Sequence, residues 1–132
     1  MNIFKCMLLI FVFCGFTFAK TPCVNINNKL NATQKEVLQN NLKRQLKAER
    51  VNVLKFFKVQ NISVGYIETY DADEAFVFYV GDEYKSNFII MWSGAAEISE
   101  EKNIEKWAKD NVPGIPARLA QCFAWYAIYR HD

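Results

Sequence analysis

The sequence predicts an α+β fold with an N-terminal helix, a four-stranded antiparallel meander, two C-terminal helices and one disulfide. Leucines recur at helical spacing before residue 50, four runs of aromatic and β-branched residues follow up to residue 92, and helical patterns return after residue 98. Helices grouped before and after the strands are typical of α+β proteins. Strands joined by short turns pair antiparallel, because a parallel pair needs a long crossover.

The chain opens with the features of a secretory signal peptide. Lys5 supplies a positive charge, an apolar stretch follows, and Thr17 and Ala19 place small residues at the −3 and −1 positions of a cut before Lys20. We therefore expect residues 1–19 to be cleaved and the protein to be exported, either periplasmic or secreted.

The remaining residues, 20–132, are expected to form a single small domain, because they suit one hydrophobic core and are too few for two. The alternative for the leader is an uncleaved membrane anchor. Its apolar part, residues 6–19, is shorter than the roughly 20 residues that span a bilayer. Membrane contact is expected only through such an uncleaved leader.

Two cysteines remain after the leader, Cys23 near the start of the mature chain and Cys122 near its end. In an oxidising compartment they are expected to form a disulfide that ties the two ends together. The alternative is a redox or nucleophilic cysteine, which is usually accompanied by a CxxC motif or a basic neighbour. The sequence shows neither.

The first helix is expected to start at Thr33, because its hydroxyl and the carboxylate of Glu36 match a capping box. It should end near Glu49 or Arg50, where the pattern changes to strand-like alternation. A narrow apolar stripe indicates that one face lies on the sheet. The stripe consists of Leu38, Leu42 and Leu46.

Four strands should follow, with turns at Gln60–Asn61 and Gly81–Asp82. In the second strand, Ile62, Val64 and Tyr66 share one face. The expected strands cover residues 51–59, 62–68, 76–80 and 87–92. A helix followed by a four-stranded meander resembles cystatin-like architecture in outline. The resemblance is one of topology and implies no function.

Two helices should complete the chain. Ser99 begins the first, with Glu100 and Glu101 in the turn where the helix dipole favours carboxylates. Pro113 stops it, because the residue before a proline avoids helical dihedrals. The last helix, with Pro116 in its first turn and an end near Tyr129, is apolar nearly all round, so we expect it to lie between the sheet and another layer.

The sequence shows no catalytic, metal or cofactor motif, and no cofactor is expected. His131 is the only histidine and lies next to the C-terminus, which argues against a Ser-His-Asp triad and against a multi-histidine zinc site. Ser93 lies in a Trp-Ser-Gly-Ala-Ala segment that lacks the GxSxG pattern of serine hydrolases. A tight strand exit at Gly94 is the simpler interpretation.

Two acidic turns carry side chains of the kind that bind calcium. They contain Asp71, Asp73 and Glu74, and Asp82 and Glu83. An EF-hand needs glycine at its sixth position and glutamate at its twelfth, where this chain has Phe76 and Asp82. Solvated turns are the simpler interpretation, and calcium binding is the alternative. Glycosylation sequons begin at Asn31 and Asn61.

Charge is separated along the chain, although the formal net charge is only +2. Residues 29–58 hold eight bases and two acids, whereas residues 66–105 hold ten acids and two bases. Such asymmetry steers a protein partner, or forms two solvated faces that complement each other. Nucleic acid is not an expected partner, because the acidic segment balances the basic one and no RNA-binding motif is present.

The expected function is that of an exported, non-enzymatic binding protein of the inhibitor or immunity type, acting on a protein partner in the exported compartment. This prediction rests on small size, one disulfide, separated charge, and aromatic residues that can anchor an interface. The first alternative is a carrier with an apolar pocket between the sheet and the helices. The second is a hydrolase that uses carboxylates such as Asp73 or Glu97.

Overall fold

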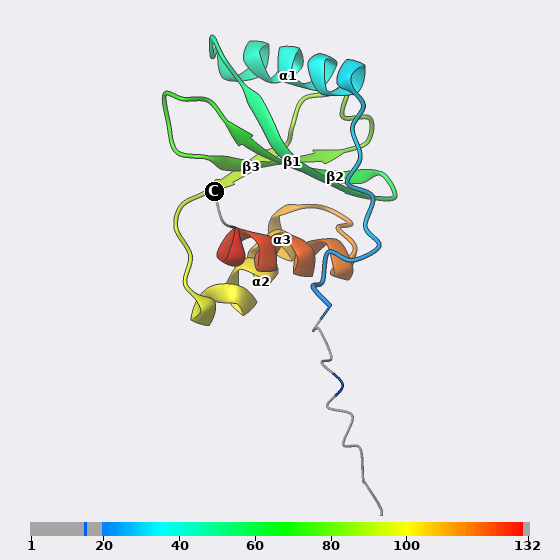
Figure 1. Cartoon of the computed structure of the whole chain (residues 1–132), viewed down its shortest axis with the longest axis vertical. Coiled ribbons are helices and arrows are strands. Elements are labelled where there is room, and N and C mark those ends of the chain that lie inside the picture. Colours follow the sequence, from blue (N-terminus) through cyan, green and yellow to red (C-terminus); the bar gives the residue numbers. More distant parts are fainter. Residues whose placement is uncertain (1–14, 16–19, 131–132) are drawn as a thin grey trace, which may run out of the picture.

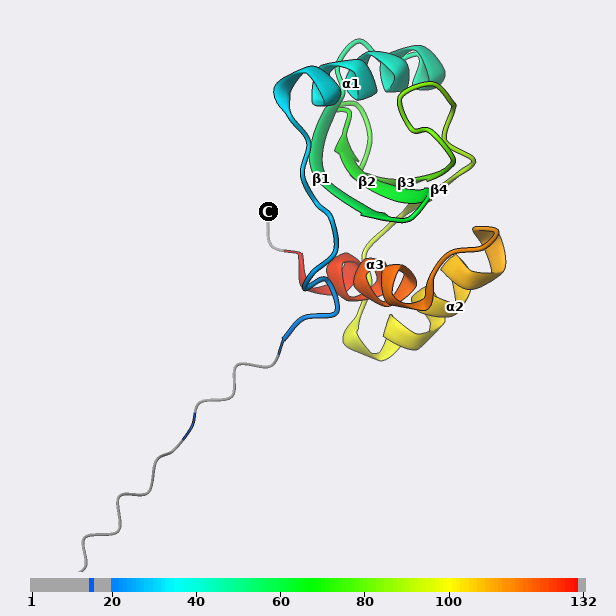
Figure 2. The same ribbon diagram turned by 90° about the vertical axis from the view of Figure 1, so that its right-hand side faces the viewer.

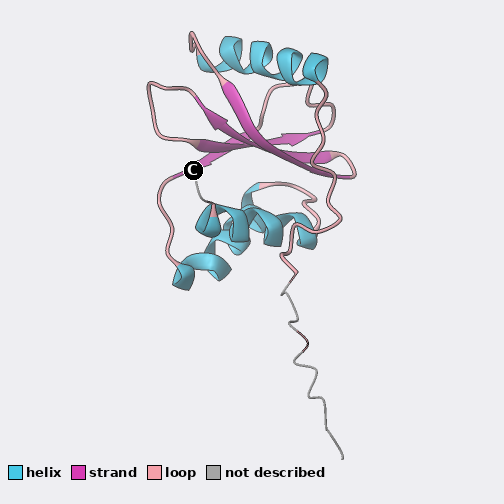
Figure 3. Ribbon diagram, viewed as in Figure 1, coloured by secondary structure: helices cyan, strands magenta, loops and turns pink. Residues whose placement is uncertain are grey.

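The computed structural model describes Gly15 and residues 20–130. Apart from Gly15, the predicted signal peptide lies outside the described residues, and so does His131. The domain is layered, with one helix above the sheet and two below it (Figures 1 and 3). In chain order the elements are α1 (Ala32–Leu46), β1 (Asn52–Val59), β2 (Ile62–Glu68), β3 (Ala75–Val80), β4 (Ile90–Ser93), the short 3₁₀-helix η1 (Ile98–Glu100), α2 (Glu101–Asn111) and α3 (Ala117–Tyr129).

The sheet is an antiparallel meander in the order β1-β2-β3-β4, which confirms the predicted α+β fold class. Gln60 in the β1–β2 turn has a φ of 56°, and Gly81 after β3 has a φ of 97°. Successive side chains of each strand alternate between the two faces. One row of paired residues crosses all four strands on the α1 face: Phe56, Gly65, Val77 and Met91.

Separate hydrophobic cores cover the two faces of the sheet. On one face α1 packs through Leu38 and Leu42, which are fully buried. On the other face α3 inserts Phe123, whose ring centroid lies 5.0 Å from that of Phe76 and 4.9 Å from that of Phe78. Figure 2 shows α2 outside α3. The last helix therefore lies between the sheet and another layer, as predicted.

The capping box of α1 differs from the predicted one. Asn31, rather than Thr33, is the cap: its Oδ1 accepts from the Gln34 N–H at 2.8 Å, and Gln34 Oε1 accepts from the Asn31 N–H at 3.1 Å. Leu30 packs against the core under α1 and so favours the earlier start. The helix also ends earlier, at Leu46, because Lys47 adopts a left-handed conformation with a φ of 54°.

The fourth strand begins at Ile90, later than the predicted Asn87. Side chains of α1 hold the preceding segment instead. Gln45 Nε2 donates to the Phe88 carbonyl at 2.9 Å, and Gln45 Oε1 accepts from the Phe88 N–H at 3.0 Å. Asn41 Nδ2 donates to the Tyr84 carbonyl at 2.6 Å. These amides satisfy backbone groups that a neighbouring strand would otherwise have paired.

The predicted disulfide is present and joins the N-terminal segment to α3. Cys23 and Cys122 are 99 positions apart, with an S–S distance of 2.09 Å and a Cα–Cα distance of 4.7 Å. From the bridge, residues 20–30 rise past the sheet to α1 (Figure 1), and the Lys58 N–H donates to the Asn27 carbonyl at 2.8 Å. Within the described ranges, no helix is long and apolar enough to cross a membrane.

Candidate functional site

An open groove lies where the C-terminal end of α1 meets the sheet, and we call it the α1 groove. Its volume is about 390 Å³, within the range of ligand-binding sites. The groove lies between the end of α1, the β2–β3 loop and β4. Its lining residues are Leu46, Lys47, Ala48, Ile67, Thr69, Asp71, Ala72, Asp73, Ala75, Met91 and Ser93.

The lining of the α1 groove combines apolar and acidic side chains. Leu46 comes from α1 and Met91 from β4, and the Met91 side chain is 45% exposed. Asp71 and Asp73 come from the β2–β3 loop and are exposed. Neither carboxylate forms an ion pair with another described residue. The groove can therefore accept an apolar side chain and place a cation beside it.

The two edges of the sheet differ in how they are protected. The β1 edge is covered at one end by Asn27 and is bent by a register shift between Val53 and Lys55. Coverage, irregular register and charged side chains are the means by which proteins protect sheet edges. Strand β4 pairs with β3 on one side, and no described segment pairs with its other side. It carries no charge, and shortness is its one protective feature.

Apolar side chains are exposed along this unprotected edge, Ile89–Ser93, which we call the β4 edge. Ile89 is 48% exposed and Met91 is 45% exposed. Ile89 lies in the bend just before β4, and Met91 lies within the strand. Tyr70 of the β2–β3 loop is also exposed, with the Arg50 guanidinium 4.6 Å from its ring centroid. Exposed apolar groups next to a groove are typical of an interaction surface.

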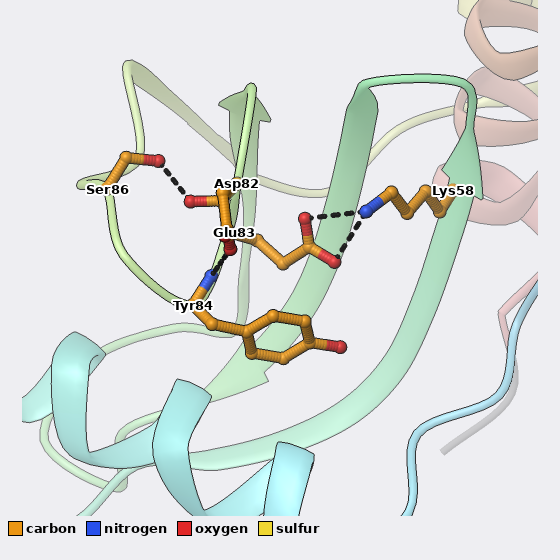
Figure 4. A network of polar contacts seen from close by, with 5 residues as sticks. All are labelled: Lys58, Asp82, Glu83, Tyr84 and Ser86. Atoms are coloured by element: carbon orange, nitrogen blue, oxygen red, sulfur yellow. Dashed lines mark hydrogen bonds and ion pairs between the residues drawn. The ribbon is translucent and has the colours of Figure 1, made fainter.

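A cluster of polar residues surrounds the loop that follows β3 (Figure 4). Lys58 Nζ lies 2.9 Å from both carboxylate oxygens of Glu83. The Glu83 side chain is only 1% exposed, and that of Lys58 is 30% exposed. The Asp82 carboxylate accepts from the Tyr84 N–H at 2.9 Å, and the Asp82 carbonyl accepts from the Ser86 hydroxyl. The ion pair fastens this loop to β1.

Two hydroxyl groups lie in the same region without partners. Ser63 pairs with Lys58 on one side and with Tyr79 on the other. The Ser63 and Tyr79 hydroxyls are buried and have no hydrogen-bond partner among the described residues. Burial raises the pKa of Tyr79, and the charge of Glu83 raises it further. Burial also raises the pKa of Tyr84, followed by the charge of Glu83, a hydrogen bond to Glu83 and the charge of Asp82.

Neither region contains an assembled acid–base pair. The Glu83 carboxylate holds the Lys58 ammonium, and Ser63 is fully buried, so a substrate cannot reach this serine. The two acids considered for a hydrolase lie in different places. Asp73 lines the α1 groove. Glu97 lies at the start of η1, where its N–H donates to Glu100 Oε2 at 2.7 Å. No hydrogen bond or ion pair joins Asp73 to Glu97 within residues 20–130.

The acidic turns do not converge. Asp71 and Asp73 precede β3, whereas Asp82 and Glu83 follow it, so the strand separates the two turns. Among the residues that the structure describes, no group of three or more His, Cys, Asp or Glu side chains is arranged to hold a metal ion. The described residues of the two turns therefore do not come together as a calcium site.

The separated charges are only partly divided between the two outer layers, because six of the ten acids lie on β2, in the β2–β3 loop or in the loop after β3. The basic segment includes α1, and the acidic segment includes η1 and the start of α2, which lie on the other side of the sheet (Figures 1 and 2). Of the ion pairs between described residues, only Lys58–Glu83 joins the two segments. The others, Lys106–Asp110 and Lys109–Glu105, lie within α2. The charge separation therefore persists on the surface.

Sequence reasoning identified the acids of the β2–β3 loop but missed the α1 groove and the β4 edge. The groove depends on where α1 ends above the sheet, which the helical pattern leaves open. A signal for the edge was present, because residues 89–92 read Ile-Ile-Met-Trp and are apolar at both alternating positions. In the last strand of a meander, only one of its two sides has a neighbouring strand.

Comparison with known proteins identified no relative of this chain. No family model matches it, and searches of curated proteins and of solved structures found no significant match. The cystatin-like outline therefore stays a likeness of topology.

Proposed function

We propose that this chain is an exported, non-enzymatic binding protein of the inhibitor or immunity type that acts on another protein. The observation that carries the proposal is the β4 edge, an unprotected strand with half-exposed Ile89 and Met91 beside the α1 groove. Helices cover both faces of the sheet, so its edges are the parts left for recognition. Export is supported by the leader pattern and by the Cys23–Cys122 disulfide.

Surface charge supports the same proposal. The bases of α1 and the acids of the β2–β3 loop lie on different elements, and such separation orients a charged partner before contact. Exposed Met and Ile beside an acidic rim provide an apolar centre with a polar border, which is the usual anatomy of a protein interface.

Native mass spectrometry of the protein recovered from its own host's exported fraction tests the proposal. We expect a complex of fixed stoichiometry that survives physiological salt. Met91→Lys should abolish the complex, because it places a charge on the β4 edge, whereas Leu54→Lys, at an exposed apolar position on the opposite edge strand, should leave it intact. Failure to retain any protein would contradict the proposal. The denatured mass also reports whether the chain begins at Lys20.

A small apolar ligand is the second candidate occupant, and the volume and largely apolar lining of the α1 groove favour it. The carrier hypothesis had placed its pocket between the sheet and the helices. On the α3 face, Phe123 fills that space with contacts to Phe76 and Phe78, so the α1 groove is the place left for such a ligand. A native mass increase of a few hundred daltons, without protein, would favour the carrier function.

A further inference from the structure

We propose that the partner presents an extended, positively charged segment that adds to the β4 edge as a fifth strand and places an apolar side chain in the α1 groove. This inference rests on the proposed function and specifies the chemistry of the partner. Three features carry it: the unpaired backbone of β4, the exposed apolar side chains beside it, and the unpaired carboxylates at the rim of the groove.

The backbone of the β4 edge selects the conformation of the partner. An edge strand has a row of N–H and C=O groups that an extended segment can pair with. At the β1 edge, the Lys58 N–H is already bonded to Asn27, and the register is interrupted between Val53 and Lys55. The β4 edge lacks these obstacles among the described residues. A partner strand therefore has a continuous place only at β4.

The α1 groove selects a side chain. Met91 belongs both to the β4 edge and to the groove lining. A strand paired with β4 projects every second side chain toward the α1 face, where the groove opens. Leu46 and Ile67 supply apolar lining there. A groove of about 390 Å³ accommodates one such side chain, as the pockets in other strand-addition sites do.

Charge selects the sign of the segment. Asp71 and Asp73 line the groove without ion pairs to described residues. Lys47 also lines the groove, and Arg130 donates to the Gly94 carbonyl just after β4. Glu74, beside Asp73, and the exposed Glu97 and Glu100 after β4 keep acids in excess over these two bases. A basic segment meets complementary charge at the rim and after the strand, whereas an acidic one meets repulsion there.

Titration of the ¹⁵N-labelled, oxidised protein with a defined peptide tests the inference. The probe is the capped pentapeptide Lys-Val-Lys-Val-Lys, and its counterpart Glu-Val-Glu-Val-Glu carries the opposite charge. We expect the basic peptide to shift the amide signals of Ile90 and Met91, and the acidic peptide to bind at least about fivefold more weakly. Raising the salt concentration should weaken the binding of the basic peptide, because exposed charges are screened.

Backbone methylation distinguishes strand addition from loose charge attraction. Two versions of the basic peptide carry N-methyl groups on alternate residues, one on each edge of the extended chain. Only one version should lose binding, because only one edge of the added strand donates hydrogen bonds to β4. Equal loss or equal retention by the two versions would overturn the inference.

Matched variants locate the charge. The double variant Asp71→Asn with Asp73→Asn should weaken binding of the basic peptide about twofold to tenfold. Glu36 is an exposed acid of α1, and Glu36→Gln should have no effect on this binding. Absence of any β4 shift at millimolar peptide, or β4 shifts that follow protein concentration without peptide, would overturn the inference; the latter would make a second copy the occupant.

The two proposals fail separately. A protein complex in native mass spectra that persists in Met91→Lys would overturn strand addition and leave the binding function standing. Peptide binding at β4, together with no retained protein partner, would overturn the binding function and leave the chemistry of the edge established.

Discussion

At the scale of single residues, Lys58 and Glu83 form the polar contact with the largest expected effect on stability. Glu83 is almost completely buried, and both of its carboxylate oxygens lie 2.9 Å from Lys58 Nζ. Removing one member of a buried pair leaves an uncompensated charge in a medium of low polarity. An exposed pair such as Lys106–Asp110 stays solvated when one member is removed.

Lys58→Met should lower the free energy of unfolding by about 3 kcal/mol, at the low end for buried pairs because the ammonium is partly exposed. Lys106→Met, the matched control, should cost about 0.5 kcal/mol. Denaturant unfolding of Lys58→Met, Glu83→Gln and the double variant measures the coupling, and the double variant should cost less than the sum of the two. Equal costs for Lys58→Met and Lys106→Met would contradict this.

Because the pKa of Tyr79 is raised in the folded protein, we expect a loss of stability at alkaline pH. Its folded pKa is raised, chiefly by burial, so the folded protein holds the proton more tightly than the unfolded chain. Its contribution is fully present below about pH 10 and is lost as the pH rises above that value. Tyr79→Phe should flatten the decline in unfolding free energy above about pH 10.

The same variant removes a buried hydroxyl that has no described partner. At pH 7 it should therefore leave stability unchanged or raise it by up to about 1 kcal/mol. Exposed Tyr70→Phe serves as the control and should leave the alkaline decline as it is in the parent protein. Parallel pH profiles for the parent and Tyr79→Phe would refute this role for Tyr79.

At the scale of elements, side chains of α1 determine where neighbouring segments begin and end. Gln45 and Asn41 bind the backbone at Phe88 and Tyr84, and so delay the start of β4. Gln39 Oε1 accepts from the Val53 N–H at 3.0 Å, next to the register shift in β1. The helix thus satisfies backbone donors and acceptors that the sheet leaves open.

The cap of α1 can be tested by two substitutions in the same turn. Asn31→Ala should lower the free energy of unfolding by about 1 kcal/mol, because the Gln34 N–H loses its acceptor. Thr33→Ala should change stability by less than about 0.5 kcal/mol, because Thr33 is an exposed residue inside the first turn. Thermal and denaturant unfolding measure both. A larger loss of stability for Thr33→Ala than for Asn31→Ala would instead support Thr33 as the cap, as predicted from the sequence.

At the scale of the whole molecule, the sheet is enclosed on both faces and the chain is closed by one bridge. α1 covers one face, α3 and α2 cover the other, and Cys23–Cys122 ties the segment before α1 to the last helix. Among the described residues, one ion pair, Lys58–Glu83, joins the basic segment (residues 29–58) to the acidic segment (residues 66–105). The β4 edge and the α1 groove lie side by side and share Met91.

Replacing both cysteines, Cys23→Ser with Cys122→Ser, should lower the free energy of unfolding by about 2–5 kcal/mol, because the bridge closes a loop of 99 positions. Reductant should destabilise the parent protein by a similar amount and leave the double variant unchanged. The denatured parent should weigh two hydrogens less than its reduced form. A parent protein that does not respond to reductant would contradict a stabilising bridge.

Local sequence patterns were sufficient to predict the class and order of the elements. Leucine spacing over Leu38–Leu46, alternation in β2 and the turn at Gly81 are local patterns, and each reflects the period of a helix or strand or the dihedral freedom of one residue. The disulfide also followed, because only two cysteines lie after residue 19. Burial of the strongly apolar α3 between layers was likewise predictable from its composition.

Tertiary structure alone decided the features that depend on contacts between distant residues. Lys58 and Glu83 are 25 positions apart, and Gln45 and Phe88 are 43 apart; no local periodicity encodes such pairs. Two capping boxes were available within one turn, and the packing of Leu30 favoured Asn31. The α1 groove exists because α1 ends at Leu46 while the β2–β3 loop and β4 continue beyond it. Its acids were visible in the sequence, but the apolar neighbours that make them a site were brought together only by packing.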